Sequence, residues 1–117
     1  MKRLVGFALG LMVVLAAQAH TPLQASSPAA DASVAAPKTL ELTFGGEVRL
    51  TSVSLTDAGG AAKHLDAVPT AVASKFSFGI HELLPPGAYK VVWRAVGGDT
   101  HIITGEFGFT VTAAPVR

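Results

Sequence analysis

The sequence predicts an all-β protein, a small antiparallel sandwich of two sheets, and three observations lead to this prediction. Apolar and polar residues alternate in several short runs, which is typical of half-buried strands. Turn residues, mainly glycine and proline, separate these runs at short intervals. No segment has a sustained apolar period of 3.6 residues, so no amphipathic helix is expected. The length of 117 residues fits a single domain.

The amino-terminal 19 residues have the pattern of a secretory signal peptide. Lys2 and Arg3 form a short basic region, residues 4–17 form an uncharged apolar run, and Ala17–Ala19 is a small-x-small cleavage site. A transmembrane anchor is the alternative, but spanning a bilayer takes about 20 apolar residues, and this run is shorter. We therefore expect cleavage after residue 19, export, and a mature domain of residues 20–117 that is not embedded in a membrane.

Removal of the signal peptide leaves 98 of the 117 residues and changes the ligands available to a metal ion. The chain has no cysteine, and its two methionines, Met1 and Met12, are both in the predicted signal peptide. The mature domain then has no sulfur ligand of the kind that selects Cu(I), so a metal site must use nitrogen and oxygen. The formal net charge of +1 becomes −1 on loss of Lys2 and Arg3, and no basic cluster remains that would indicate a nucleic-acid partner.

Cleavage after residue 19 makes His20 the first residue of the mature chain. A free amino-terminal histidine offers two nitrogen donors, its α-amine and its imidazole Nδ1, which can close a chelate ring on one metal ion. This arrangement is called a histidine brace. If cleavage falls a residue or two away, His20 is instead an ordinary exposed residue.

The first half of the mature chain predicts an extended arm and two strands. Residues 21–38 are rich in Pro, Ala and Ser, which indicates an arm with turns. Leu40–Phe44 alternates apolar and polar side chains and predicts a strand that Gly45–Gly46 should end. Val48–Thr56 predicts a second strand, in which the apolar phase slips by one residue. Because such a slip moves side chains to the other face, we expect a bulge or a strand that changes sheets.

The second half predicts three more strands separated by turns. Asp57–Gly60 has turn chemistry, and residues 61–72 are expected to form a loop with a short strand. Alternating apolar side chains predict strands at Phe76–Ile80, Tyr89–Ala95 and Ile103–Val111. The Pro-Pro-Gly turn of Leu83–Gly87 precedes the second of these strands, and Gly97–Gly98 ends it. Trp93 is expected in the core, as are the phenylalanines.

Asp99 and His101 lie two residues apart, next to the last predicted strand. In extended structure the side chains at i and i+2 point to the same side, so this carboxylate and imidazole could converge on one small ion. The flanking strands would hold the pair on a rigid frame. The motif is short, and a surface acid beside a surface histidine is the alternative interpretation.

Several of these segments together resemble the periplasmic copper-resistance proteins of the CopC type. The resemblance covers essentially the whole mature chain. Its most specific parts are Leu84–Arg94, Asp99–His101 and Gly105–Phe109, and its less specific parts are Ser27–Ala30 and Leu42–Phe44. The family also begins its mature form with histidine directly after an Ala-x-Ala site, as His20 follows one here. The resemblance implies an Ig-like, Greek-key β-sandwich or barrel that binds Cu(II).

The resemblance further implies the ligands of the ion. One Cu(II) per chain would be bound by the amine and imidazole of His20, the imidazole of His101 and the carboxylate of Asp99. Three nitrogens and one oxygen near one plane suit the tetragonal preference of Cu(II). The pattern of residues alone had indicated the same three residues. The resemblance also implies a periplasmic location and copper exchange with an inner-membrane copper importer or another periplasmic copper protein.

The chain departs from the family pattern in three places. Many members have a methionine-rich Cu(I) site, which a mature chain without methionine cannot form. Gly97 stands where the family often has serine, and Phe44–Glu47 stands where it often has Phe-Ser-Glu-Pro. Hydrogen bonds that orient the ligands can therefore differ, and such bonds tune metal affinity. Glu47 could orient the site or be a solvated acid.

The residues favour a non-enzymatic protein that binds Cu(II) for sequestration, transport or resistance. A copper-dependent oxidative enzyme is one alternative, because histidine braces also occur in polysaccharide monooxygenases; such enzymes keep an open metal position. A metal-free Ig-like interaction domain is the other. His64 and His81 have no partner at metal-ligand spacing, so we expect them to be surface residues, with a second weak site as the alternative.

Overall fold

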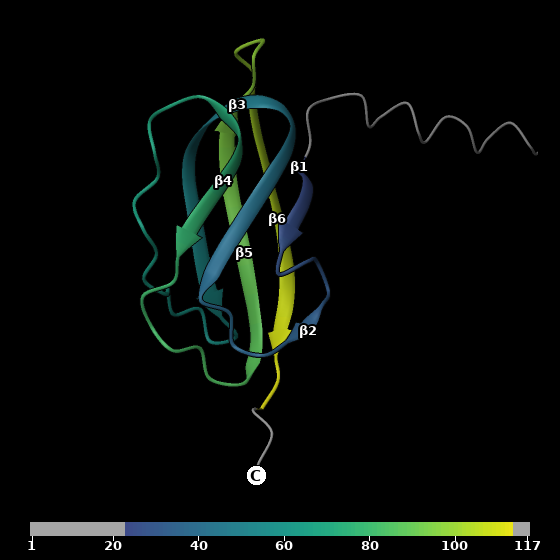
Figure 1. The fold of residues 1–117 in the computed structure, drawn as a ribbon, viewed down its shortest axis with the longest axis vertical. Helices are drawn as coiled ribbons and strands as arrows, with labels where there is room; N and C mark the ends of the chain where they lie inside the picture. The colour runs from purple at the N-terminus through teal and green to yellow at the C-terminus, as the bar shows by residue number, and fades with distance from the viewer. Residues whose placement is uncertain (1–22, 114–117) are drawn as a thin grey trace, which may run out of the picture.

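The computed structural model describes residues 23–113, which form six β-strands (Figure 1). In chain order the strands are β1 (Leu23–Ser27), β2 (Ser33–Val34), β3 (Thr39–Asp57), β4 (Ala73–Gly79), β5 (Gly87–Val96) and β6 (Ile102–Val111). Within these residues, no helix is long and apolar enough to cross a membrane. The predicted signal peptide and His20 lie outside the described residues.

The strands form two sheets that share one long strand. The first part of β3 pairs with β1 on one side and β4 on the other, and its second part pairs with β5. β5 pairs with β6, and β6 pairs with β2, so that β3 connects the two sheets and curls the whole into a sandwich (Figure 1). The all-β sandwich predicted from the sequence is confirmed.

β3 confirms one prediction about its sequence and contradicts another. Leu42 pairs with Phe76 of β4, whereas Leu50 pairs with Ala95 of β5, so the strand changes sheets between these two residues. Its apolar phase slips directly after that change, where the pairing with β5 has an irregular register between Leu50 and Ser52, as expected of a bulge. The expected end at Gly45–Gly46 is wrong, because β3 continues through both glycines. The pairing with β4 loses its register between Thr43 and Val48 instead. At these two positions glycine permits the bend by which β3 passes from one sheet to the other, without ending the strand.

The amino-terminal arm contains more regular structure than its composition predicts. Residues 21–38 were expected to form an extended arm, and their described part includes β1 and β2. β2 pairs with β6 in parallel, so the sheet is not purely antiparallel. Residues 61–72 form a loop without the expected short strand, and Ala62 and Leu65 make isolated bridges there. Composition missed these pairings because each depends on a partner far away in the sequence.

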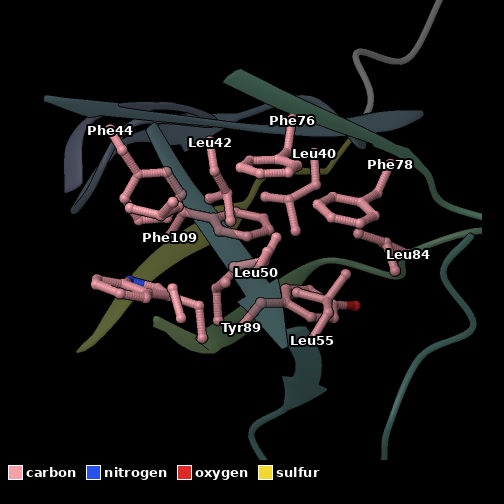
Figure 2. Close-up of a cluster of buried hydrophobic side chains, with 14 of the residues drawn as sticks. Leu40, Leu42, Phe44, Leu50, Leu55, Phe76, Phe78, Leu84, Tyr89 and Phe109 are labelled. Carbon is pink, nitrogen blue, oxygen red and sulfur yellow. The ribbon is translucent and has the colours of Figure 1, made fainter. Parts of the chain in front are cut away.

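The core lies between the two sheets and contains hydrophobic side chains from both of them (Figure 2). No polar or charged residue is buried among the described residues. β3 supplies more of the buried hydrophobic side chains than any other strand, since it has inward side chains in both sheets. The buried residues are Leu40, Leu42, Phe44, Val48, Leu50, Leu55, Phe76, Phe78, Leu84, Tyr89, Val91, Trp93, Ala95, Phe109 and Val111.

Trp93 connects the two sheets, and it is buried as predicted. Its ring packs edge to face against Phe44 of β3, with ring centroids 5.0 Å apart. On β6 it lies over Gly105, where a Cβ atom would come within 2.6 Å of Trp93 Cζ2. The glycine is therefore required by the indole ring that covers it, and a larger residue would force the ring to move.

Gly105→Ala should destabilise the fold because the added methyl group would overlap the Trp93 ring. Overpacking of this kind costs about 1–3 kcal/mol, and urea unfolding followed by tryptophan fluorescence would measure it. Gly98→Ala is the matched control, because a Cβ atom there meets nothing within 4 Å. Equal unfolding midpoints for the two variants would contradict this account of Gly105.

Candidate metal centre

The Asp99–His101 pair lies in the loop that joins β5 to β6. The two strands pair continuously from Gly87 and Val111 at one end to Val96 and Ile102 at the other. The inward side chains of β5 are buried in the core and those of β6 are buried or partly buried, while the loop projects at one end of the sandwich (Figure 1). The predicted rigid frame for the pair is therefore confirmed, because both chain segments that enter the loop are anchored.

The loop itself is a tight turn, which differs from the extended geometry expected for this pair. The amide of Gly97 donates to the carbonyl of His101 at 3.0 Å, and the amide of Thr100 donates to the carbonyl of Gly97 at 2.9 Å. Thr100 has a φ of 70°, in the left-handed region that a β-branched residue seldom adopts. The side chains of Asp99 and His101 thus meet because the chain turns between them, and not through strand alternation.

Asp99 contacts His101 through two hydrogen bonds. Its Oδ1 accepts from the backbone amide of His101 at 3.1 Å, and its Oδ2 lies 2.9 Å from His101 Nδ1. The side chains remain 64% and 78% exposed, so both groups are accessible to a solvated ion. The loop has already brought an oxygen donor and a nitrogen donor together at its tip.

The hydrogen bonds from His101 lower the pKa of the Asp99 carboxyl below its ordinary value of 3.8. The backbone amide of His101 is the larger cause, and its imidazole is the next. Asp99 is therefore an ionised acceptor at neutral pH, so the shared hydrogen is on His101 Nδ1. A carboxylate paired with an imidazole in this way can orient the ring or bind a metal ion itself.

His101→Ala should raise the pKa of Asp99 only part of the way to its ordinary value. The variant loses the imidazole hydrogen bond but keeps the larger contribution, the backbone amide. Because the pKa of Asp99 is lowered in the folded state, its ionised form stabilises the fold at neutral pH. This contribution is lost as the pH falls through the folded-state pKa. NMR titration of the Asp99 carboxyl carbon would measure both values. An unchanged midpoint would show that the imidazole makes no such contact.

Glu47, which the sequence offered as a possible orienting residue, lies exposed in β3. It takes part in none of the ion pairs or side-chain hydrogen bonds of the described residues. His20 lies outside the described residues, so its part in the site stays a prediction. The structure thus brings together two of the three predicted ligands, Asp99 and His101.

Residues 23–112 match the family model of the CopC domain, which covers most of the chain and all six strands. The chain belongs to the CopC family. The resemblance stated from the sequence is confirmed by this match.

Curated relatives and solved structures agree with the family assignment. Copper resistance protein C of Escherichia coli is 40% identical over 112 residues, covering 85% of this chain and 86% of the relative. The protein of the same name from Pseudomonas syringae pv. tomato is 37% identical over 120 residues, covering 90% of each. PcoC, a methionine-rich copper resistance protein from Escherichia coli, superimposes with a TM-score of 0.67 at 37% identity, covering 80% of this chain and 100% of PcoC.

A further solved relative is CopC from Methylosinus trichosporium OB3b, with a TM-score of 0.67 and 32% identity. The superposition covers 94% of the Methylosinus protein and 80% of this chain. The comparison with PcoC also identifies a difference. PcoC is described as methionine-rich, whereas this chain has two methionines, both before residue 23. The described domain therefore has the family fold without thioether ligands.

The sequence offered His64 and His81 as a second weak site only as the alternative, and it gave no indication of Asp66 beside them. His64 and His81 are exposed, as predicted, but their ring centroids are only 5.8 Å apart. His81 Nε2 also lies 2.5 Å from Asp66 Oδ1. Their spacing in the sequence gave no indication of this, because the contact depends on the register between the loop after β3 and the segment after β4.

Proposed function

We propose that this protein binds one Cu(II) per chain in the periplasm, for sequestration, transport or resistance. The four donors are the amine and imidazole of His20, the imidazole of His101 and the carboxylate of Asp99. The observation that carries the proposal is the contact between Asp99 and His101 at the tip of a rigid hairpin. The names of the relatives, which are copper resistance proteins, support copper as the ion.

The position of β1 supports a contribution from His20. Leu23, the first described residue, pairs with Phe44 and lines a shallow cavity together with Trp93. β1 begins toward the end of the sandwich that carries the β5–β6 loop and runs away from it (Figure 1). From Trp93 to the end of β5 is three residues, or about 10 Å along a strand, and the three residues from Leu23 back to His20 can span about the same length.

Both Asp99 and His101 can bind the same ion only if their mutual hydrogen bond is exchanged for bonds to the metal. Their side chains are mostly exposed and already in contact, so small rotations suffice. Asp99 is ionised before the ion arrives, and this removes the cost of deprotonating the carboxyl. With four protein donors the square plane of Cu(II) is filled, which favours binding and transfer of the ion over catalysis on it.

The donor set predicts that an additional residue before His20 will weaken Cu(II) binding. Exported protein that begins at His20 should lose more than about 100-fold in affinity when one serine precedes it, since removing even an outer partner of a ligand costs 10–100-fold. His101→Ala should cause a comparable loss and remove one set of nitrogen couplings from the electron paramagnetic resonance spectrum. Lys75→Ala, an exposed position on β4, is the control. Equal affinity with and without the serine would exclude the amine as a ligand.

The affinity for Cu(II) should fall as the pH is lowered from about 8 to 5, because the amine and imidazole nitrogens bind the ion only after losing their protons. Asp99 should not contribute to this fall, because its pKa is lowered from 3.8 and it stays ionised throughout the range. Competition with a chelator of known affinity at several pH values would measure the dependence. Asp99→Asn should lower the affinity without changing the slope between these values. A shallower slope in this variant would show that Asp99 takes up a proton in the range, contrary to its pKa.

A further inference from the structure

His64 and His81 are held opposite each other by a short antiparallel pairing between two loops. Leu65 and Ile80 form an antiparallel bridge, and their side chains are partly buried against the core. The amide of His81 donates to the carbonyl of His64 at 2.8 Å, and the amide of Asp66 donates to the carbonyl of Gly79 at 3.1 Å. The register therefore sets His64 across from His81, with the backbone of both fixed.

Alternation along this pairing puts the polar side chains on the outer face. Leu65 and Ile80 pack inward, so residues on either side of them point outward. His64, Asp66 and His81 consequently share one exposed face. Gly79 is the residue opposite Asp66, and the Asp66 carboxylate lies over it, with Oδ2 accepting from the Gly79 amide at 2.8 Å. Because Gly79 has no side chain, the carboxylate can reach His81.

The separation of the two rings suits a shared ion. Metal–nitrogen bonds of about 2.0 Å place two imidazole ring centres roughly 4.5–6.3 Å apart, depending on the angle at the metal. The ring centres of His64 and His81 are 5.8 Å apart and the rings are inclined at 73°. Asp66 Oδ1 is 2.5 Å from His81 Nε2. The separation of the two rings is thus within the range for two imidazole ligands of one ion, and a carboxylate oxygen contacts one of the rings.

Within residues 23–113, no three His, Asp or Glu side chains already surround a common point. The Asp66 carboxylate is instead hydrogen-bonded to His81. The pKa of Asp66 is lowered chiefly by its hydrogen bond with His81, so the carboxylate is ionised and accepts the hydrogen of His81 Nε2. A metal ion that binds both groups takes the place of this one hydrogen, which passes to solvent or to the other ring nitrogen.

The charges around the cluster favour a cation. Glu82 accepts from the amide of His64 at 2.6 Å, and Lys63 lies 3.9 Å from Glu82 and 3.5 Å from Asp57. The three acids Asp57, Asp66 and Glu82 carry three negative charges against the one positive charge of Lys63, which leaves a net charge of −2 beside the rings. Carboxylates near the rings raise the local concentration of divalent ions.

From this geometry we propose a second metal site, formed by the imidazoles of His64 and His81 and the carboxylate of Asp66. It is distinct from the proposed site at the β5–β6 loop, which lies at another end of the sandwich (Figure 1). Nitrogen and oxygen donors without sulfur select a borderline divalent ion, Cu(II) before Ni(II) or Zn(II) by the Irving–Williams order. The second site should bind its ion more weakly than the first and exchange it more readily, because its donors are exposed and the ion must replace the hydrogen bond between Asp66 and His81.

Imidazole NMR of the exported protein carrying His101→Ala tests the site, because that variant removes a ligand of the first site. Titration with Zn(II), which is diamagnetic, should shift the ring signals of His64 and His81 together. The shifts should reach their limit when one Zn(II) is bound at this site. Cu(II) should broaden the same two signals. His64→Gln in the same background should raise the Zn(II) midpoint for His81 by more than about tenfold, since losing a ligand costs at least as much as losing its outer partner.

Lys75→Gln, exposed on β4, is the matched control and should leave the midpoint unchanged. His64→Gln keeps the backbone pairing and the Asp66–His81 contact, so circular dichroism should show an unaltered fold. Signals of His64 and His81 that do not respond to Zn(II), or a midpoint that His64→Gln leaves unchanged, would overturn the proposal. Failure of the first site would appear separately, at the His101 signals of the unsubstituted protein.

Discussion

The packing of Trp93 between Phe44 and Gly105 is the contact on which the rest of the structure depends. It joins β5 to the part of β3 in the other sheet and to β6 beside it. Phe44 in turn pairs with Leu23 at the start of β1. One buried ring therefore fixes the hairpin that carries Asp99 and His101 relative to the strand that follows His20. Since protein interiors are close-packed, a displacement at the indole would be felt at all of these elements.

The proposed copper site and the second site use the same arrangement in different places. In each, an aspartate accepts a hydrogen bond from a histidine ring, and the ionised carboxylate has a lowered pKa. Both pairs lie outside the regular strands, on segments held by buried residues, and both are exposed. A folded scaffold thus supplies preorganised donors while solvent access lets an ion enter and leave, which suits the function proposed for this protein.

The absence of sulfur ligands from residues 23–113 distinguishes this domain from its methionine-rich relative. PcoC shares the fold, with a TM-score of 0.67, so the sandwich does not require the methionines for its stability. In this chain the segment between β3 and β4 contains His64 and Asp66. Soft and borderline ligands select different copper oxidation states, and the change in donor chemistry restricts the described domain to ions that accept nitrogen and oxygen.

The sequence by itself determined the sandwich, its core and the identity of the candidate ligands. Alternation of apolar side chains is a local consequence of strand geometry, so β4, β5, β6 and the burial of Trp93 could be predicted directly, and the phase slip in β3 indicated the bulge between Leu50 and Ser52. Only the tertiary structure decided that Gly45–Gly46 bends β3 without ending it, and that β2 pairs in parallel with β6. It also decided that His64 meets His81, and that a turn with Thr100 in the left-handed region brings Asp99 to His101. These outcomes depend on partners and registers that are distant in the sequence, and a local pattern carries no information about them.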